Sequence, residues 1–212
     1  FPTVVEKLIS KSDNLFDGTF TTLTSLESEN LVSNGDFLIA KPSPNQNQPL
    51  GFDFANASNV SLSGGIATFT ATASYGGIYT TITNQTIGDI FYHFAKIKTD
   101  APAGKIILGG FAGSASNILS NDYQFLSRVS NPITNINFNA SISDARTSEW
   151  TPIEVDYMGV INITDLVNRG ILPGGLTDAQ YKELLDSKVF NNVPLRETDY
   201  IAVEPSKAYK LI

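Results

Sequence analysis

Carboxylates and one histidine are the side chains of this chain that could carry acid–base chemistry. The 212 residues include 21 Asp and Glu, a single His and no Cys. Hydrolysis of a glycosidic bond requires a pair of carboxylates. The middle of the chain offers Asp53, Asp89, Asp100 and Asp122. Most of these stand beside turn signals, where Asp usually bonds to the backbone. We therefore expect no enzyme, with a glycan depolymerase as the minor alternative.

His93 is more simply explained as a structural residue than as a catalyst. In an extended strand it shares a face with Phe91, Ala95 and Ile97. A single histidine excludes histidine-based zinc sites, and the absence of Cys excludes thiolate ligands and a cysteine nucleophile. The chain also has no Gly-x-Ser-x-Gly elbow, phosphate loop or Gly-x-Gly-x-x-Gly motif.

Aromatic residues suggest binding rather than catalysis. They make up 10% of the chain, and eight of them are Tyr. A sugar ring stacks its apolar face on an aromatic ring, while its hydroxyls bond to polar neighbours. Our candidate carbohydrate-binding residues are Tyr75, Tyr79, Tyr92 and Tyr123, which lie among Asn, Ser and Gln. The alternative is that these rings close the edges of a sandwich.

The charge pattern argues against two classes of partner. The net charge is −7 and the isoelectric point about 4.6, and the Lys and Arg residues are scattered. Such a chain repels the phosphate backbone of nucleic acids. The uncharged run from Phe54 to Gly88 is rich in Ser, Thr, Asn and Gly. It is too polar for a bilayer-spanning helix, so we expect no nucleic acid and no membrane insertion.

Alternating apolar and polar residues predict antiparallel strands. Ile136, Phe138, Ala140 and Ile142 alternate with Asn and Ser. The same period of two runs through Ala67–Ala73 and Ile153–Tyr157. Further strands are expected at Leu31–Ser33, Gly51–Ala55, Gly77–Ile82, Ile90–Lys98, Lys105–Phe111 and Tyr123–Val129. Such short strands between Gly, Pro and Asn turns predict an all-β antiparallel sandwich of the jelly-roll type.

The strand pattern is confined to the middle of the chain, and the two ends are expected to have other structures. Residues 1–29 are expected to form a linker or arm, residues 30–160 the sandwich, and residues 161–212 a C-terminal extension with one short helix. A capping box at Thr177-Asp178-Ala179-Gln180 begins that helix, which we expect at Thr177–Asp186. A helical turn is expected at Thr164–Arg169. The segment Ile161–Asp186 has too many apolar residues to remain in water, so it should fold against the sandwich.

Two motifs resemble carbohydrate-binding-module jelly rolls. Asn-Leu-Val-Ser-Asn-Gly-Asp-Phe, residues 30–37, resembles the first strand of such modules. Trp-Thr-Pro-Ile-Glu-Val-Asp, residues 150–156, resembles the closing strand. In that family the two strands pair and often share a structural calcium ion. The resemblance carries this metal site over to Asp36 and Asp156, whereas Asn34-Gly35-Asp36 read by itself is equally a simple turn.

The next stretch, residues 160–173, resembles a segment of tailed-bacteriophage tail-fibre and minor structural proteins. It keeps Ile161, Thr164, Leu166, Gly170 and Pro173 of that pattern. The resemblance implies a tail protein of the virion, extracellular after lysis. Its partner would be a host cell-wall or capsular polysaccharide. The alternative is a structural tail-fibre or baseplate segment that contacts other virion chains. Such fibres are commonly trimeric, so a homo-oligomer is expected.

Overall fold

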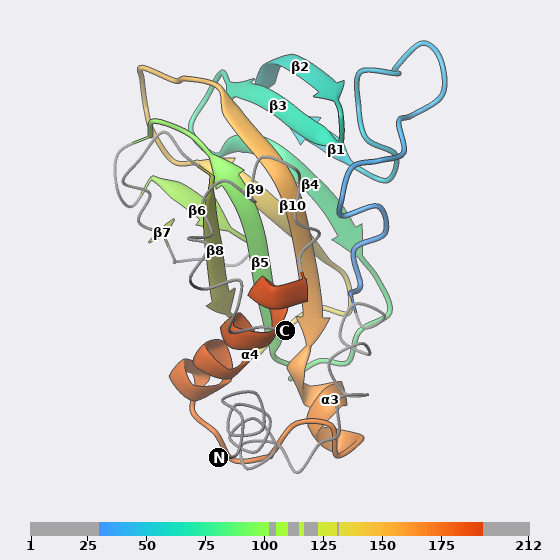
Figure 1. Ribbon diagram of the computed structural model, residues 1–212, viewed down its shortest axis with the longest axis vertical. Helices are drawn as coiled ribbons and strands as arrows, with labels where there is room; N and C mark the ends of the chain where they lie inside the picture. Colours follow the sequence, from blue (N-terminus) through green and yellow to red (C-terminus); the bar gives the residue numbers. More distant parts are fainter. Residues whose placement is uncertain (1–29, 102–104, 110–114, 117–122, 131, 193–212) are drawn as a thin grey trace, which may run out of the picture.

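The computed structural model describes residues 30–101, 105–109, 115–116, 123–130 and 132–192 (Figure 1). The expected arm at 1–29, Asp122, and residues 193–212 lie outside this part of the chain. The described residues form strands β1 (Asp53–Ala55), β2 (Ala57–Ser63), β3 (Ile66–Ala71), β4 (Gly76–Ile82), β5 (Phe91–Lys98), β6 (Ile106–Leu108), β7 (Ala115–Ser116), β8 (Gln124–Val129), β9 (Phe138–Asp144) and β10 (Ile153–Asn162). Two helices follow, α3 (Ile163–Asn168) and α4 (Asp178–Asn192).

The strands form two antiparallel sheets that pack as a sandwich. The first sheet has the order β1-β4-β9-β6-β7, and the second has the order β2-β3-β10-β5-β8. Neighbours in each sheet come from distant parts of the sequence, because β10 pairs with both β3 and β5, and β9 pairs with both β4 and β6. The predicted all-β sandwich is confirmed.

The core lies between the sheets and follows the period of two. On β5, Phe91, Ala95 and Ile97 are fully buried in this core, whereas Tyr92 and Phe94 belong to a second apolar cluster on the other face. The first sheet contributes Ile78, Ile82, Ile106, Leu108, Phe138, Ala140 and Ile142 to the core. Alternate residues of β4 and β9 therefore point away from it.

Both helices pack on the outer face of the second sheet. The second apolar cluster contains Tyr92, Phe94, Ile161, Ile163, Leu166, Leu172, Tyr181, Leu184 and Leu185. The expected return of Ile161–Asp186 onto the sandwich is thus confirmed (Figure 1). The capping box is also present, since Thr177 N donates to Gln180 Oε1 (2.9 Å) and Gln180 N to Thr177 Oγ1 (3.3 Å). Neither described helix is long and apolar enough to cross a membrane.

Several predicted boundaries were wrong. Residues 31–33 form no strand, although Leu31 N donates to Val160 O (2.8 Å) and so this segment runs beside β10. Strand β10 continues to Asn162, five residues beyond the expected end, since its later residues are buried on both faces and lose the alternation. Strand β2 was missed because Ser and Asn dominate it. Ile136 precedes β9 and is 52% exposed, so it lies outside the apolar face predicted for it.

Candidate functional site

The outer face of the first sheet is open and polar. Tyr79 on β4 lies in register between Asp53 on β1 and Ser141 on β9. Two residues further along, Thr81 Oγ1 donates to Asn139 Oδ1 (3.0 Å) across the same pair of strands. The described helices cover the second sheet instead. This face therefore offers one aromatic ring among hydroxyl, amide and carboxylate groups.

Tyr75 stands at the beginning of β4 in a strained conformation. Its φ is 65°, a left-handed value that is unusual for a bulky residue, and 64% of it is exposed. The turn is fixed because Tyr75 N donates to Asp144 O (2.6 Å) and Gly76 N to Ala73 O (2.9 Å). Such strain costs on the order of 1–3 kcal/mol and is often found at functional sites. The protein thus holds this ring in solvent at a cost to its stability.

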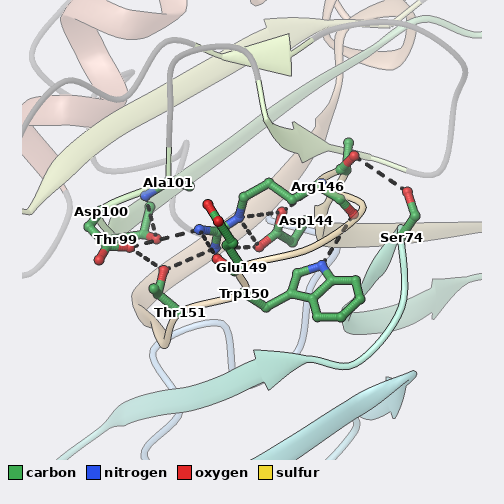
Figure 2. A network of polar contacts seen from close by, with 10 residues as sticks. Ser74, Thr99, Asp100, Ala101, Asp144, Arg146, Glu149, Trp150 and Thr151 are labelled. Atoms are coloured by element: carbon green, nitrogen blue, oxygen red, sulfur yellow. Dashed lines mark hydrogen bonds and ion pairs between the residues drawn. The ribbon is translucent and has the colours of Figure 1, made fainter.

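Trp150 is anchored to the same short segment of backbone. Its Nε1 donates to Arg146 O (3.2 Å), and the residue is half-buried. Ser74 Oγ donates to Ala145 O (3.4 Å), and Figure 2 shows the indole between the Arg146 loop and the β3–β4 connection that carries Ser74. Tyr75 and Trp150, the only tryptophan of the chain, are therefore both tied to residues 144–146.

A buried ion pair supports these two aromatic residues. Arg146 Nη2 lies 2.6 Å and Nε 2.9 Å from Asp144 Oδ2, and both residues are buried. Arg146 Nη1 also donates to Glu149 O (3.0 Å) and Nη2 to Thr151 Oγ1 (3.0 Å). The Thr151 hydroxyl in turn bonds the carboxylate of Asp100, as Figure 2 shows. This network fixes the loop that presents Trp150.

We call Tyr75, Tyr79 and Trp150 the aromatic edge. Tyr79 lies on β4, four residues after Tyr75, which stands in the turn that precedes this strand. The buried Arg146 and Asp144 neutralise each other and offer no charge to a ligand. Aromatic rings among hydroxyl, amide and carboxylate groups suit a hydroxyl-rich ligand that carries no negative charge.

Tyr92 does not belong to this site. Its side chain is fully buried on the outer face of the second sheet, where the phenol donates to Asp186 Oδ1 on α4 (2.7 Å). Burial and the neighbouring Asp186 raise the pKa of Tyr92 above its usual range. Because neither face of this buried ring is open to a ligand, the geometry does not favour Tyr92 as a sugar-binding residue, and that role stays a prediction.

Tyr123 also lies on the second sheet, away from the aromatic edge. Its hydroxyl donates to Glu154 Oε2 (2.7 Å). The Nζ atoms of Lys96 and Lys98 lie 5.6 Å and 5.9 Å from its ring centroid. These cations stand over the ring where a sugar would stack, so its binding role stays a prediction that the geometry does not favour.

The carboxylates suggested for catalysis are spread across the fold. Asp89 precedes and Asp100 follows the eight-residue strand β5, which separates them by about 25 Å at about 3.3 Å per residue. Glycosidase pairs stand about 5–10 Å apart. Asp53 Oδ1 is bound to Lys41 Nζ (2.8 Å) on the first sheet. His93 is buried, and burial followed by the charge of Arg128 lowers its pKa to about 3.

The two predicted calcium ligands have different surroundings. Asp156 is buried, and its Oδ2 lies 3.0 Å from Lys96 Nζ. Asp36 is half-buried in a turn, where Asn34 Nδ2 donates to Ile39 O (2.8 Å) and Leu50 O (3.0 Å). Across the described residues, no group of three or more His, Cys, Asp and Glu could hold a metal. The turn is present, and the calcium ion stays a prediction.

No protein-family model matches the sequence, and no curated protein matches it. Similar solved structures include a family 4 carbohydrate-binding module, with 18% identity over 62% of this chain and 99% of that chain (TM-score 0.40). A family 29 module from Piromyces equi is 20% identical over 53% and 81% (0.34). The second N-terminal cellulose-binding domain of Cellulomonas fimi β-1,4-glucanase C is 10% identical over 63% and 94% (0.43). At these values the likeness concerns the sandwich fold alone.

The sequence contains a local signal for the Asp144–Arg146 ion pair. Asp144 and Arg146 alternate with Ala145 directly after the strand pattern of residues 136–142, and Trp150 follows four residues later. An acid and a base two residues apart at a strand end are within reach of each other. Their burial depends on β4 and β6 pairing with β9 on both sides, which no local pattern reveals.

Proposed function

We propose that this chain binds a neutral glycan without cleaving it, through the aromatic edge of the first sheet. The observation that carries the proposal is Tyr75, a strained and exposed aromatic residue whose N–H donates to Asp144 O, while the Trp150 indole donates to Arg146 O. A bulky residue is kept in the left-handed region only where the surrounding structure enforces it. The benefit is an aromatic surface that loses little entropy when it binds.

The neighbouring groups support a polysaccharide as the ligand. Tyr79, Ser141 and Asn139 extend the edge along the open sheet with hydroxyl and amide groups. Hydroxyls of a sugar bond to neutral or acidic polar groups, while the rings accept its apolar face.

Pull-down on polysaccharide particles, followed by glycan-array profiling, tests this proposal. Tyr75→Ala and Trp150→Ala should each weaken retention about tenfold or more, equal to about 1.4 kcal/mol. The matched control is Ile87→Ala, which truncates a side chain of similar exposure (63%) beyond the other end of β4. Binding that survives both aromatic substitutions would refute the site. Release of reducing ends would refute the non-catalytic role.

We infer from the resemblance at residues 160–173 that the module works in a phage tail, where host-surface glycans would be its target. This proposal rests on the sequence resemblance, and α4 (Asp178–Asn192) follows where the resemblance expects a short helix. The alternative is a structural segment that binds other virion chains. Light scattering tests the expected trimer, and a monomer at high concentration would contradict it.

A further inference from the structure

A second, polar pocket lies at the end of the sandwich opposite the aromatic edge. Its volume is about 330 Å³, and its walls come from the β4–β5 connection, the β10–α3 junction and the segment beside β10. The lining residues are Leu31, Asn84, Gln85, Thr86, Asp89, Asn162, Asp165 and Asn168. Small-molecule pockets usually measure about 300–1,000 Å³, so this one suits a small ligand.

Asn162 organises the pocket. Its Nδ2 donates to Asp89 Oδ2 (2.8 Å) and to Gln85 Oε1 (3.3 Å), while its Oδ1 accepts from Asp165 N (2.9 Å) as the cap of α3. One side chain thus links all the polar walls. The geometry is fixed before a ligand arrives, which favours binding.

The remaining polar groups define the ligand. Thr86 and Asn168 are exposed in the pocket, where their hydroxyl and amide offer donors and acceptors. The carboxylates of Asp89 and Asp165 accept hydrogen bonds and repel a negatively charged ligand. Arg169 Nε lies 2.9 Å from Asp165 Oδ2 and partly balances that charge. Among the described residues there is no cluster of three acids to hold a cation.

We propose that this pocket binds a single uncharged sugar residue, as the end of a glycan or a branch. Vicinal hydroxyls of a pyranose match paired carboxylate and amide groups, each of which bonds two hydroxyls at once. Leu31 in the wall supplies a small apolar surface for the ring. The site is distinct from the aromatic edge, since Tyr75 precedes β4 and Thr86 follows it.

Chemical-shift titration of the complete chain tests this pocket directly. The probes are glucose, galactose, mannose, rhamnose and N-acetylglucosamine, each added alone. We expect saturable shifts of the side-chain amides of Asn84, Asn162 and Asn168 with at least one sugar. The exposed double variant Thr86→Val with Asn168→Ala should weaken that binding tenfold or more. Tyr75→Ala should leave it unchanged, so failure of the aromatic edge does not affect this test.

Two results would overturn the proposal. The first is the absence of saturable shifts at these amides with every sugar of the series. The second is a response of the same amides to Ca²⁺ alone, which would make the pocket a cation site. Shifts confined to Tyr75, Tyr79 and Trp150 would support the aromatic edge and exclude the pocket.

Discussion

Arg146 Nη2 lies 2.6 Å from Asp144 Oδ2, and the pair is buried at the end of β9, the central strand of the first sheet. Asp144 O accepts from Tyr75 N, and Arg146 O accepts from Trp150 Nε1. The same two residues therefore pair through their side chains and hold the two aromatic residues through their carbonyls. Stability and the proposed binding surface depend on one network.

Arg146→Met should be strongly destabilising. It leaves the Asp144 carboxylate buried without its partner, which typically costs about 3–5 kcal/mol. Urea denaturation followed by Trp150 fluorescence measures the loss, because Trp150 is the only tryptophan. The double variant Arg146→Met with Asp144→Asn removes the unpaired charge and should recover part of the stability. A loss below about 1 kcal/mol in the single variant would contradict the buried pair.

Tyr75→Gly should separate stability from binding. Glycine adopts a φ of 65° without strain, whereas Tyr75→Ala keeps the side-chain penalty. The greater conformational entropy of glycine in the unfolded chain offsets part of this gain. We therefore expect Tyr75→Gly to be about 0.5–1 kcal/mol more stable than Tyr75→Ala. Both variants should lose glycan binding alike. Equal stability of the two would indicate that the turn stores no strain.

His93 should make the protein less stable as the pH falls below 6.5. Burial lowers its pKa to about 3 in the folded state, while the unfolded chain takes up a proton near pH 6.5. Above pH 6.5 His93 is neutral in both states and does not destabilise the fold. As the pH falls from 6.5 towards 3, only the unfolded chain takes up the proton, so the free energy of unfolding decreases. Between pH 7 and 5.5 we expect a loss of about 1 kcal/mol. His93→Gln should flatten this change, measured by denaturation at both pH values.

Lys96 provides a test of the calcium prediction. Its Nζ lies 3.0 Å from the buried carboxylate of Asp156, where the resemblance expected a cation. Lys96→Met should lower stability by up to about 3–5 kcal/mol because it removes a cation from beside a buried carboxylate. Melting curves with Ca²⁺ and with chelator decide whether an ion binds. A rise in melting temperature with Ca²⁺ in the unaltered chain would favour the metal site at Asp36 and Asp156.

The sequence predicted the sandwich better than its functional surfaces. Local alternation at Phe138–Ile142 and the capping box at Thr177–Gln180 depend on neighbours in the chain, and both were confirmed. The side to which a tyrosine points depends on sheet order and on where α4 packs. Tyr79 and Tyr92 look alike in sequence, yet one lies on the open face and the other beneath a helix.

The polar pocket around Asn162 also depends on contacts between residues that are far apart in the sequence. Asn162 is a polar residue between apolar ones, and it departs from the tail-protein pattern, which has Asp at this position. Its partners Gln85 and Asp89 are more than 70 residues away in the chain. Such a contact follows from β10 pairing with β5, and no local sequence pattern reveals it.

Removing a buried side chain of α4 should destabilise the whole sandwich. Leu185 is fully buried in the second apolar cluster, so Leu185→Ala should cost about 2–5 kcal/mol. Glu183→Ala is the matched control, since this exposed residue lies on the same helix and gains helix propensity. Thermal and urea unfolding should shift in the first variant and not in the second. Because α4 packs on β8, far-ultraviolet circular dichroism should show helix and sheet melting together. If Leu185→Ala leaves the melting temperature unchanged, α4 does not contribute to the stability of the fold.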